Sequence, residues 1–204
     1  MRRFLRRFFR YYKWHLFFSL LVLICILFVY FNMTSQIEPD LTFGYVGSHY
    51  INTQSFVDYK AELELLLKDA NGDGKKLAAI TASTGDLQRD IDEVFKEMVE
   101  SENYDIYVAS KETFENYEDK SAFSSSESYI VFDEEKFDAL KDSDDRIYAV
   151  SLEDNTLAKR LGFLNTEGLY ISVAEVKDKP LTDFKKNGRN ITGYIIDNKA
   201  KYTQ

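Results

Sequence analysis

Cysteine, histidine and proline are scarce in this sequence. Among its 204 residues are one cysteine, Cys25, two histidines and two prolines. A single cysteine cannot form an internal disulfide, which fits a bacterial surface protein better than a small animal secreted domain. Beyond residue 31 the sequence contains no cysteine and one histidine, His49, so zinc sites built from these residue types are excluded there.

Motifs for nucleophilic catalysis and nucleotide binding are also missing. No G-x-S-x-G elbow, P-loop or G-x-G-x-x-G occurs, and a Ser-His-Asp triad would have to use His49. A carboxylate pair stays open among the 34 acidic residues, although no spacing singles one out. The sequence therefore favours a protein that is not an enzyme.

Acidic residues are absent from the first 32 positions, which contain six of the 26 lysines and arginines. The rest of the chain carries 20 basic against 34 acidic side chains, a net charge of −14. Such a surface repels phosphate backbones, which argues against nucleic acid as a partner, and it can attract cations.

The longest apolar run, residues 14–31, contains no Asp, Glu, Lys or Arg. As a helix it would rise roughly 27 Å, close to the hydrocarbon core of a lipid bilayer at about 30 Å. The preceding basic residues predict a cytoplasmic amino end and a single pass through the cell membrane. A cleaved signal peptide or a lipidated Cys25 is the alternative, but no A-x-A-like site follows and Ile24 is not the small residue of a lipobox.

This interpretation divides the chain into four parts. They are a basic cytoplasmic segment (1–13), a transmembrane helix in contact with the bilayer (14–31), a polar spacer (32–40) and an extracytoplasmic, extracellular domain (41–204). About 170 residues after the apolar run suffice for one domain with its own core.

Apolar strands alternate with helical periods in residues 41–204, which predicts an α/β domain with a mainly parallel, doubly wound sheet. Tyrosine and phenylalanine alternate with other residues in the strands, as in "YDIYV", where core packing explains most of them and an aromatic sugar platform is the alternative. The expected strands are 41–47, 76–83, 104–110, 129–133, 146–152, 169–176 and 191–197, and the expected helices are 53–70, 84–103 with Thr84 or Asp86 as N-cap, 111–119, 134–143, 154–163 and 179–188.

The stretch "KDANGDGKKL" resembles the opening of a calcium-binding loop. Asp69, Asn71 and Asp73 occupy alternate positions, Gly74 supplies a sharp turn, and Lys75 offers its carbonyl oxygen. Ile80 stands where a complete EF-hand has its bidentate glutamate, so we expect at most a helix-loop-strand calcium site. A plain turn is the alternative, because N-G and D-G favour turns without any metal.

Small hydroxyl residues follow the three clearest strands. In an open parallel sheet, ligands bind beyond the carboxyl ends of the strands. A rim there could bind a small polar or anionic solute, and helix N-capping is the alternative role. The rim consists of Ser48, His49, Ser83, Thr84 and Ser110.

Roughly Leu41–Val176 is similar to part of a bacterial extracellular solute-binding protein of the type 2 periplasmic-binding class. The similarity rests on "YDIYVASKETFENYEDKSAF", "YIVFDEEKF" and "RIYAVSLEDNTLAKRLGF", in that order. It implies a reduced, single-lobe form, because a full protein of that class has two lobes and about twice this length. No ligand residue of the family can be carried over.

Three functions are expected from these observations. The first is binding of a small polar solute, in the service of a transporter or sensor. The second is a scaffold that contacts a membrane protein complex and takes no small ligand. The third, an anchored hydrolase, would depend on His49 or on a carboxylate pair.

Overall fold

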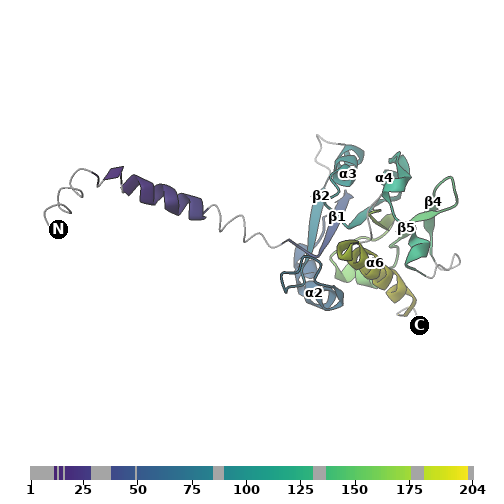
Figure 1. Cartoon of the computed structure of the whole chain (residues 1–204). Helices are drawn as coiled ribbons and strands as arrows, with labels where there is room; N and C mark the ends of the chain where they lie inside the picture. The colour runs from purple at the N-terminus through teal and green to yellow at the C-terminus, as the bar shows by residue number, and fades with distance from the viewer. Residues whose placement is uncertain are drawn as a thin grey trace. The chain divides into compact units, whose positions relative to one another are not determined.

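The chain forms two compact units, Met1–Glu38 and Pro39–Gln204. Figure 1 shows the chain as a computed structural model, and each unit is described by itself. The residues that the structure describes are 12, 14–15, 17–28, 38–48, 50–84, 90–130, 137–175 and 182–201, without the side chains of Thr84 and of 198–201.

The predicted membrane anchor is contradicted by the structure. Nowhere in the described part of the chain does a helix combine the length and the apolar character needed to cross a membrane. The predictions of a transmembrane helix over 14–31 and of a single-pass cell-membrane location are therefore wrong.

The second unit is built on a mixed sheet of six strands in the order β2-β1-β3-β6-β5-β4. Strand β1 pairs in parallel with β2 and β3, whereas the pairs β3–β6, β5–β6 and β4–β5 are antiparallel. The prediction of a mainly parallel, doubly wound sheet is therefore wrong. The strands are β1 Leu41–Gly47, β2 Ala78–Thr84, β3 Ile106–Ser110, β4 Ala139–Lys141, β5 Ile147–Ser151 and β6 Leu169–Val173.

Helices cover both faces of this sheet, and each face has its own apolar core (Figure 1). The alternation of strand side chains assigns Ile106 and Val108 to one core, and Tyr107 and Ala109 to the other. The first core packs against α2 (Thr53–Leu66), α5 (Thr156–Arg160) and α6 (Asp183–Lys201), and the second against α3 (Ile91–Glu100), α4 (Lys111–Asn116) and the 3-10 turn η1 (Lys120–Ala122).

Side-chain caps determine where helices α2 and α3 begin. Asn52 caps α2, because its Oδ1 accepts from the backbone N–H groups of Gln54 and Ser55 at 3.1 and 3.3 Å. Asp90 caps α3 by accepting from Asp92 N. The predicted N-caps, Thr84 or Asp86, are too early: Thr84 ends β2, and residues 85–89 lie outside the described residues.

The last helix replaces two predicted elements. A helix over 179–188 and a strand over 191–197 were expected, but α6 runs without a break through both Gly188 and Gly193. Its buried Ile191 and Ile195 are four residues apart, the period of a helix rather than a strand. Gly188 is needed for close packing, because a Cβ there would lie 3.3 Å from the Asp105 carbonyl oxygen.

A hairpin stands where a helix was expected over 134–143. Strand β4 lies in this range and turns directly into β5. Asp142 closes the turn, since its Oδ1 accepts from Asp144 N at 2.9 Å and Arg146 N at 3.1 Å, and Asp145 has a φ of 63°. The strand expected over 129–133 falls mostly outside the described residues, which stop at 130.

One buried carboxylate organises the connection from α2 to β2. Asp40 is 0% exposed. Its Oδ1 accepts from Ala70 N at 2.7 Å and more weakly from Asn71 N at 3.4 Å, and its Oδ2 accepts from Leu77 N at 2.9 Å. Asn187 of α6 donates to the Asp40 carbonyl oxygen at 3.2 Å. The loop is therefore held to the start of β1 and to the last helix.

Replacing Asp40 should destabilise the fold strongly. Asp40→Ala leaves buried N–H groups without acceptors, and we expect a loss of about 3 kcal/mol in the free energy of unfolding. Asp40→Asn retains one acceptor oxygen and should lose less. Urea unfolding of the full chain measures both, with the exposed Glu167→Ala as control. Equal stability of Asp40→Ala and Glu167→Ala would contradict this role.

Candidate functional site

A cavity of about 400 Å³ opens on the sheet face that carries α3 and α4. It lies at the amino end of β3 and beyond the carboxyl end of β6. Its walls come from the end of α3, from the segment around η1 and from the start of α6. The lining residues are Val99, Glu100, Glu102, Tyr107, Tyr117, Asp119, Ala122, Ala174, Glu175, Thr182 and Lys185.

A second cavity of about 390 Å³ lies between α3 and α4. It shares Glu100, Tyr117 and Asp119 with the first, so the two adjoin along these residues. We call the two cavities together the acidic trough. The remaining lining residues of the second cavity are Asp92, Glu93, Phe95, Lys96, Thr113, Asn116 and Glu118.

Tyr107 contributes a polar group to the lining of the first cavity. The residue is 1% exposed and lines the first cavity, yet its hydroxyl has no hydrogen-bond partner among the described residues. Burial raises the pKa of this hydroxyl, and the negative charge of Asp105 raises it further, so Tyr107 stays protonated. A molecule bound in the cavity could supply the hydrogen-bond partner that this hydroxyl lacks.

Tyr117 forms the wall that the two cavities share. Its ring is half-buried and meets the rings of Phe95 and Phe123 edge-on, with centroids 5.8 and 5.5 Å apart. Burial raises the pKa of its hydroxyl, and the charges of Asp119 and Glu100 add to the rise. The trough thus has a fixed aromatic wall in a field of negative charge.

Carboxylates dominate the polar lining, with seven acidic residues against two lysines. Both lysines already have acidic partners. Lys185 Nζ lies 3.5 Å from Asp105 Oδ1, and Lys96 Nζ lies 3.9 Å from Glu100 Oε1. The interior of the trough therefore carries an excess of negative charge.

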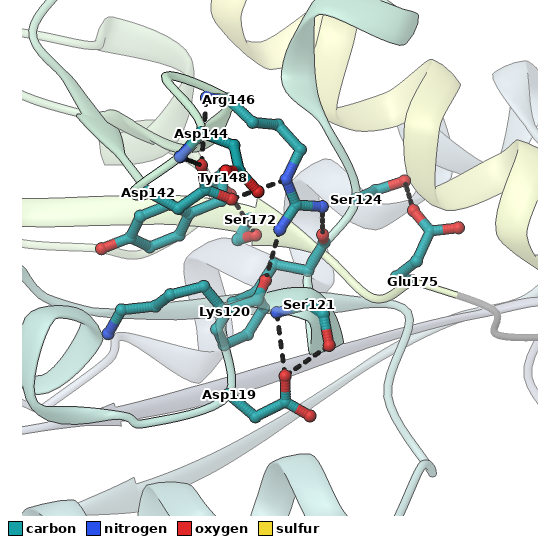
Figure 2. A network of polar contacts seen from close by, with 11 residues as sticks. Asp119, Lys120, Ser121, Ser124, Asp142, Asp144, Arg146, Tyr148, Ser172 and Glu175 are labelled. Carbon is teal, nitrogen blue, oxygen red and sulfur yellow. Dashed lines mark hydrogen bonds and ion pairs between the residues drawn. The ribbon is translucent and has the colours of Figure 1, made fainter.

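Glu175 is held in a fixed orientation at the end of β6 (Figure 2). Its Oε2 accepts from Ser124 Oγ at 2.5 Å and lies 3.5 Å from Arg189 Nη2. Arg189 Nη2 also donates to Ser124 Oγ at 2.6 Å. The other oxygen, Oε1, accepts no hydrogen bond from any residue that the structure describes, and remains available to the cavity that Glu175 lines.

Arg146 ties the η1 wall of the trough to the β4–β5 hairpin (Figure 2). Its Nε donates to Asp142 Oδ2 at 2.8 Å, and its Nη1 and Nη2 donate to the carbonyl oxygens of Phe123 and Lys120, both at 2.9 Å. Lys120 Nζ in turn donates to three carbonyl oxygens at the end of α4, those of Phe114, Glu115 and Tyr117. These bonds position Tyr117 and Asp119.

The predicted hydroxyl rim lies at a different edge of the sheet. Parallel pairing brings the carboxyl ends of β2, β1 and β3 together, with Val46 opposite Ser83. Ser110 caps α4, since its Oγ accepts from Thr113 N at 3.2 Å, which is the alternative role considered for the rim. Ser48, Ser83 and Ser110 line neither cavity of the trough, while His49 and the Thr84 side chain lie outside what the structure describes.

The calcium-like loop is closed by its own side chains. Asp69 accepts from Gly72 N and Gly74 N at 2.7 and 2.9 Å, Asn71 from Asp73 N at 2.9 Å, and Asp73 from Lys75 N at 2.8 Å. Within the described ranges, no group of three or more His, Cys, Asp or Glu side chains is arranged to hold a metal ion.

The trough was not predicted from the sequence. Tyr107 belongs to the "YDIYV" strand, whose alternation indicated core packing and gave no sign of an unpaired hydroxyl. Glu100, Asp119 and Glu175 come from three separate segments that only the folded chain brings together.

Comparisons with known proteins add no identification. No protein-family model, no curated protein and no solved structure matches this chain. The similarity to a solute-binding lobe therefore stays a prediction.

The Asp142–Arg146 pair should make stability depend on pH in the acid range. The hydrogen bond from Arg146 lowers the pKa of the Asp142 carboxyl. A lowered pKa in the folded state stabilises the protein above the unfolded pKa of about 3.9, and this contribution is lost as the pH falls through the folded value. Wild type should exceed Asp142→Asn in stability by a constant amount above about pH 5, and by progressively less below about pH 4.

Urea unfolding between pH 7 and the acid range, read as the difference between wild type and variant, measures this effect. Asp144→Asn, an exposed change in the same turn, is the control. A difference between wild type and Asp142→Asn that does not change with pH would contradict the assignment.

Proposed function

We propose that residues 39–204 form a non-catalytic binding module that holds a small polar solute in the acidic trough. The observation that carries the proposal is the pair of adjoining cavities, about 400 and 390 Å³, with the unpaired hydroxyl of Tyr107 in the lining of the first. Each cavity has a volume within the range of small-molecule sites, roughly 300–1,000 Å³.

The chemistry of the lining favours binding over catalysis. The trough offers carboxylate oxygens, two tyrosine hydroxyls of raised pKa, and apolar rings. Among its described lining residues, no nucleophile lies beside a general base, the arrangement that covalent catalysis needs.

The order of elements supports a solute-binding-like lobe. Strand β3 leads directly into α4 and then a loop, and β5 leads into α5, which is the order on which the similarity to that family was based. The trough takes the place of the predicted hydroxyl rim as the site, because the rim hydroxyl of Ser110 already serves as a helix cap.

A solute that binds the trough should stabilise the full chain against heat. At a free concentration a hundred times the dissociation constant, binding adds about 2.7 kcal/mol, which corresponds to several degrees for a domain of this size. Thermal unfolding is measured with a panel of small polar solutes, neutral, anionic and cationic. Tyr117→Ala and Glu102→Gln should reduce the shift, and the exposed Tyr50→Ala should not.

The Glu102→Gln variant should fold normally, because the exposed Glu102 side chain makes no hydrogen bond to a described residue. A smaller shift in this variant would therefore reflect weaker binding. A solute that shifts wild type and both trough variants equally would place the site elsewhere. A chain that responds to no solute, while purifying with a defined protein partner, would favour the scaffold function instead.

Calcium binding by the loop is a second candidate, favoured by the alternating oxygen-bearing residues Asp69, Asn71 and Asp73. Four hydrogen bonds curl the backbone so that Asp69, Asn71 and Asp73 all turn their oxygens toward the loop's own N–H groups. Carboxylate and amide oxygens at such alternate positions are the ligands that calcium prefers.

If the loop binds calcium, millimolar calcium should raise the melting temperature above that in EDTA by several degrees. Asp73→Asn should remove the rise, and Asp58→Asn, on the exposed side of α2, should retain it. An identical melting temperature in calcium and in EDTA would establish the loop as a turn and nothing more.

A further inference from the structure

We infer that the solute is an organic cation, an aliphatic chain bearing two or more ammonium groups. This inference rests on the proposed function and names the class of ligand that the same trough would take. Three features lead to it: the excess of negative charge, the state of the two tyrosines, and the paired shape of the cavity.

The charge of the lining selects the sign of the ligand. Seven carboxylates and two lysines line the trough, and both lysines are within 4 Å of a carboxylate of their own. An anion would have to break these pairs or sit against a lining in which carboxylates outnumber lysines. A cation would instead be attracted by that excess of negative charge.

The tyrosines suit an ammonium group. Tyr107 presents a protonated hydroxyl without a protein partner, and its oxygen can accept a hydrogen bond from a bound N–H. The face of the fixed Tyr117 ring can attract a cation through its quadrupole. Phe95 and Val99 supply apolar surface for the methylene groups between the charges.

The two cavities indicate more than one cationic group. Glu102 and Glu175 line the first cavity alone, Asp92 and Glu118 line the second alone, and Glu100 and Asp119 line both. Each cavity thus has carboxylates of its own besides the two that it shares. A linear chain with two ammonium groups could meet a carboxylate in each cavity, with its stem along Tyr117, which lines both.

The test is isothermal titration calorimetry of the full chain with a linear aliphatic triamine. A diol and a dicarboxylate of the same chain length serve as ligand controls. The triamine should bind at least about a hundredfold more tightly than either. The difference should persist at about 0.3 M salt, where loose surface attraction is largely screened.

Variants locate the site. Glu100→Gln removes a carboxylate that both cavities share and should weaken triamine binding by roughly tenfold. Glu167→Gln, an equally conservative change at an exposed position outside the trough, should leave the affinity unchanged. Equal weakening by both would show that the triamine responds to overall charge, and would overturn the inference.

The outcomes separate this inference from the proposed function. Binding of the diol or the dicarboxylate in the trough would overturn the cation assignment and leave the binding module standing. If no solute binds, the triamine included, both the cation inference and the proposed binding module would be overturned. A lysine-rich peptide that binds more tightly than the triamine would replace the small cation by a protein partner.

Discussion

The antiparallel pairing of β3 with β6 is the constraint on which the rest of the site depends. Its register sets Ile106 opposite Val173, so the residues just after β6 lie beside the amino end of β3. Glu175 is thereby brought to the cavity that Tyr107 lines, and the bridge between Phe123 and Ala174 adds η1 with its Asp119 cap. A parallel β6 would end at the opposite edge, beside Ser110, and the trough would lose one of its walls.

The Tyr107 hydroxyl differs from other unpaired polar groups in its position. Asp40 and Asn155 are buried and satisfied: Asp40 accepts three backbone N–H groups, and Asn155 both caps α5 and donates to the Ile195 carbonyl oxygen. Among the described residues, Arg189 Nε and Thr192 Oγ1 are buried without a partner, but they line neither cavity. Tyr107 lines a cavity, so its unpaired hydroxyl is a hydrogen-bonding position that a ligand can reach. Such a position is what a binding site requires, since the ligand then supplies the missing partner.

Local patterns in the sequence predicted local structure well and predicted the site poorly. Strand β1, helix α2 and the strands at Ile106 and Ile147 were expected from periodicity, because alternation and the helical period are written in neighbouring residues. The order and direction of the strands are not encoded in neighbouring residues. Strand β6 has the same buried, apolar character whether it pairs in parallel or antiparallel. Helix α6 was misjudged because its β-branched isoleucines and two glycines disfavour helix locally, while their packing against the sheet and against Asp105 favours it. The residues that line the trough come from α3, from the segment around η1 and from the end of β6. They lie close together only because β6 pairs antiparallel with β3.

The most direct test of the account is Tyr107→Phe, measured without any ligand and then with the triamine. If the hydroxyl is reserved for a ligand, removing it should leave the free energy of unfolding within about 0.5 kcal/mol of wild type, or raise it, because no protein partner is lost. The same change should weaken triamine binding by roughly tenfold. A loss of stability of about 1 kcal/mol or more, with unchanged affinity, would show that the hydroxyl serves the fold and would contradict the account.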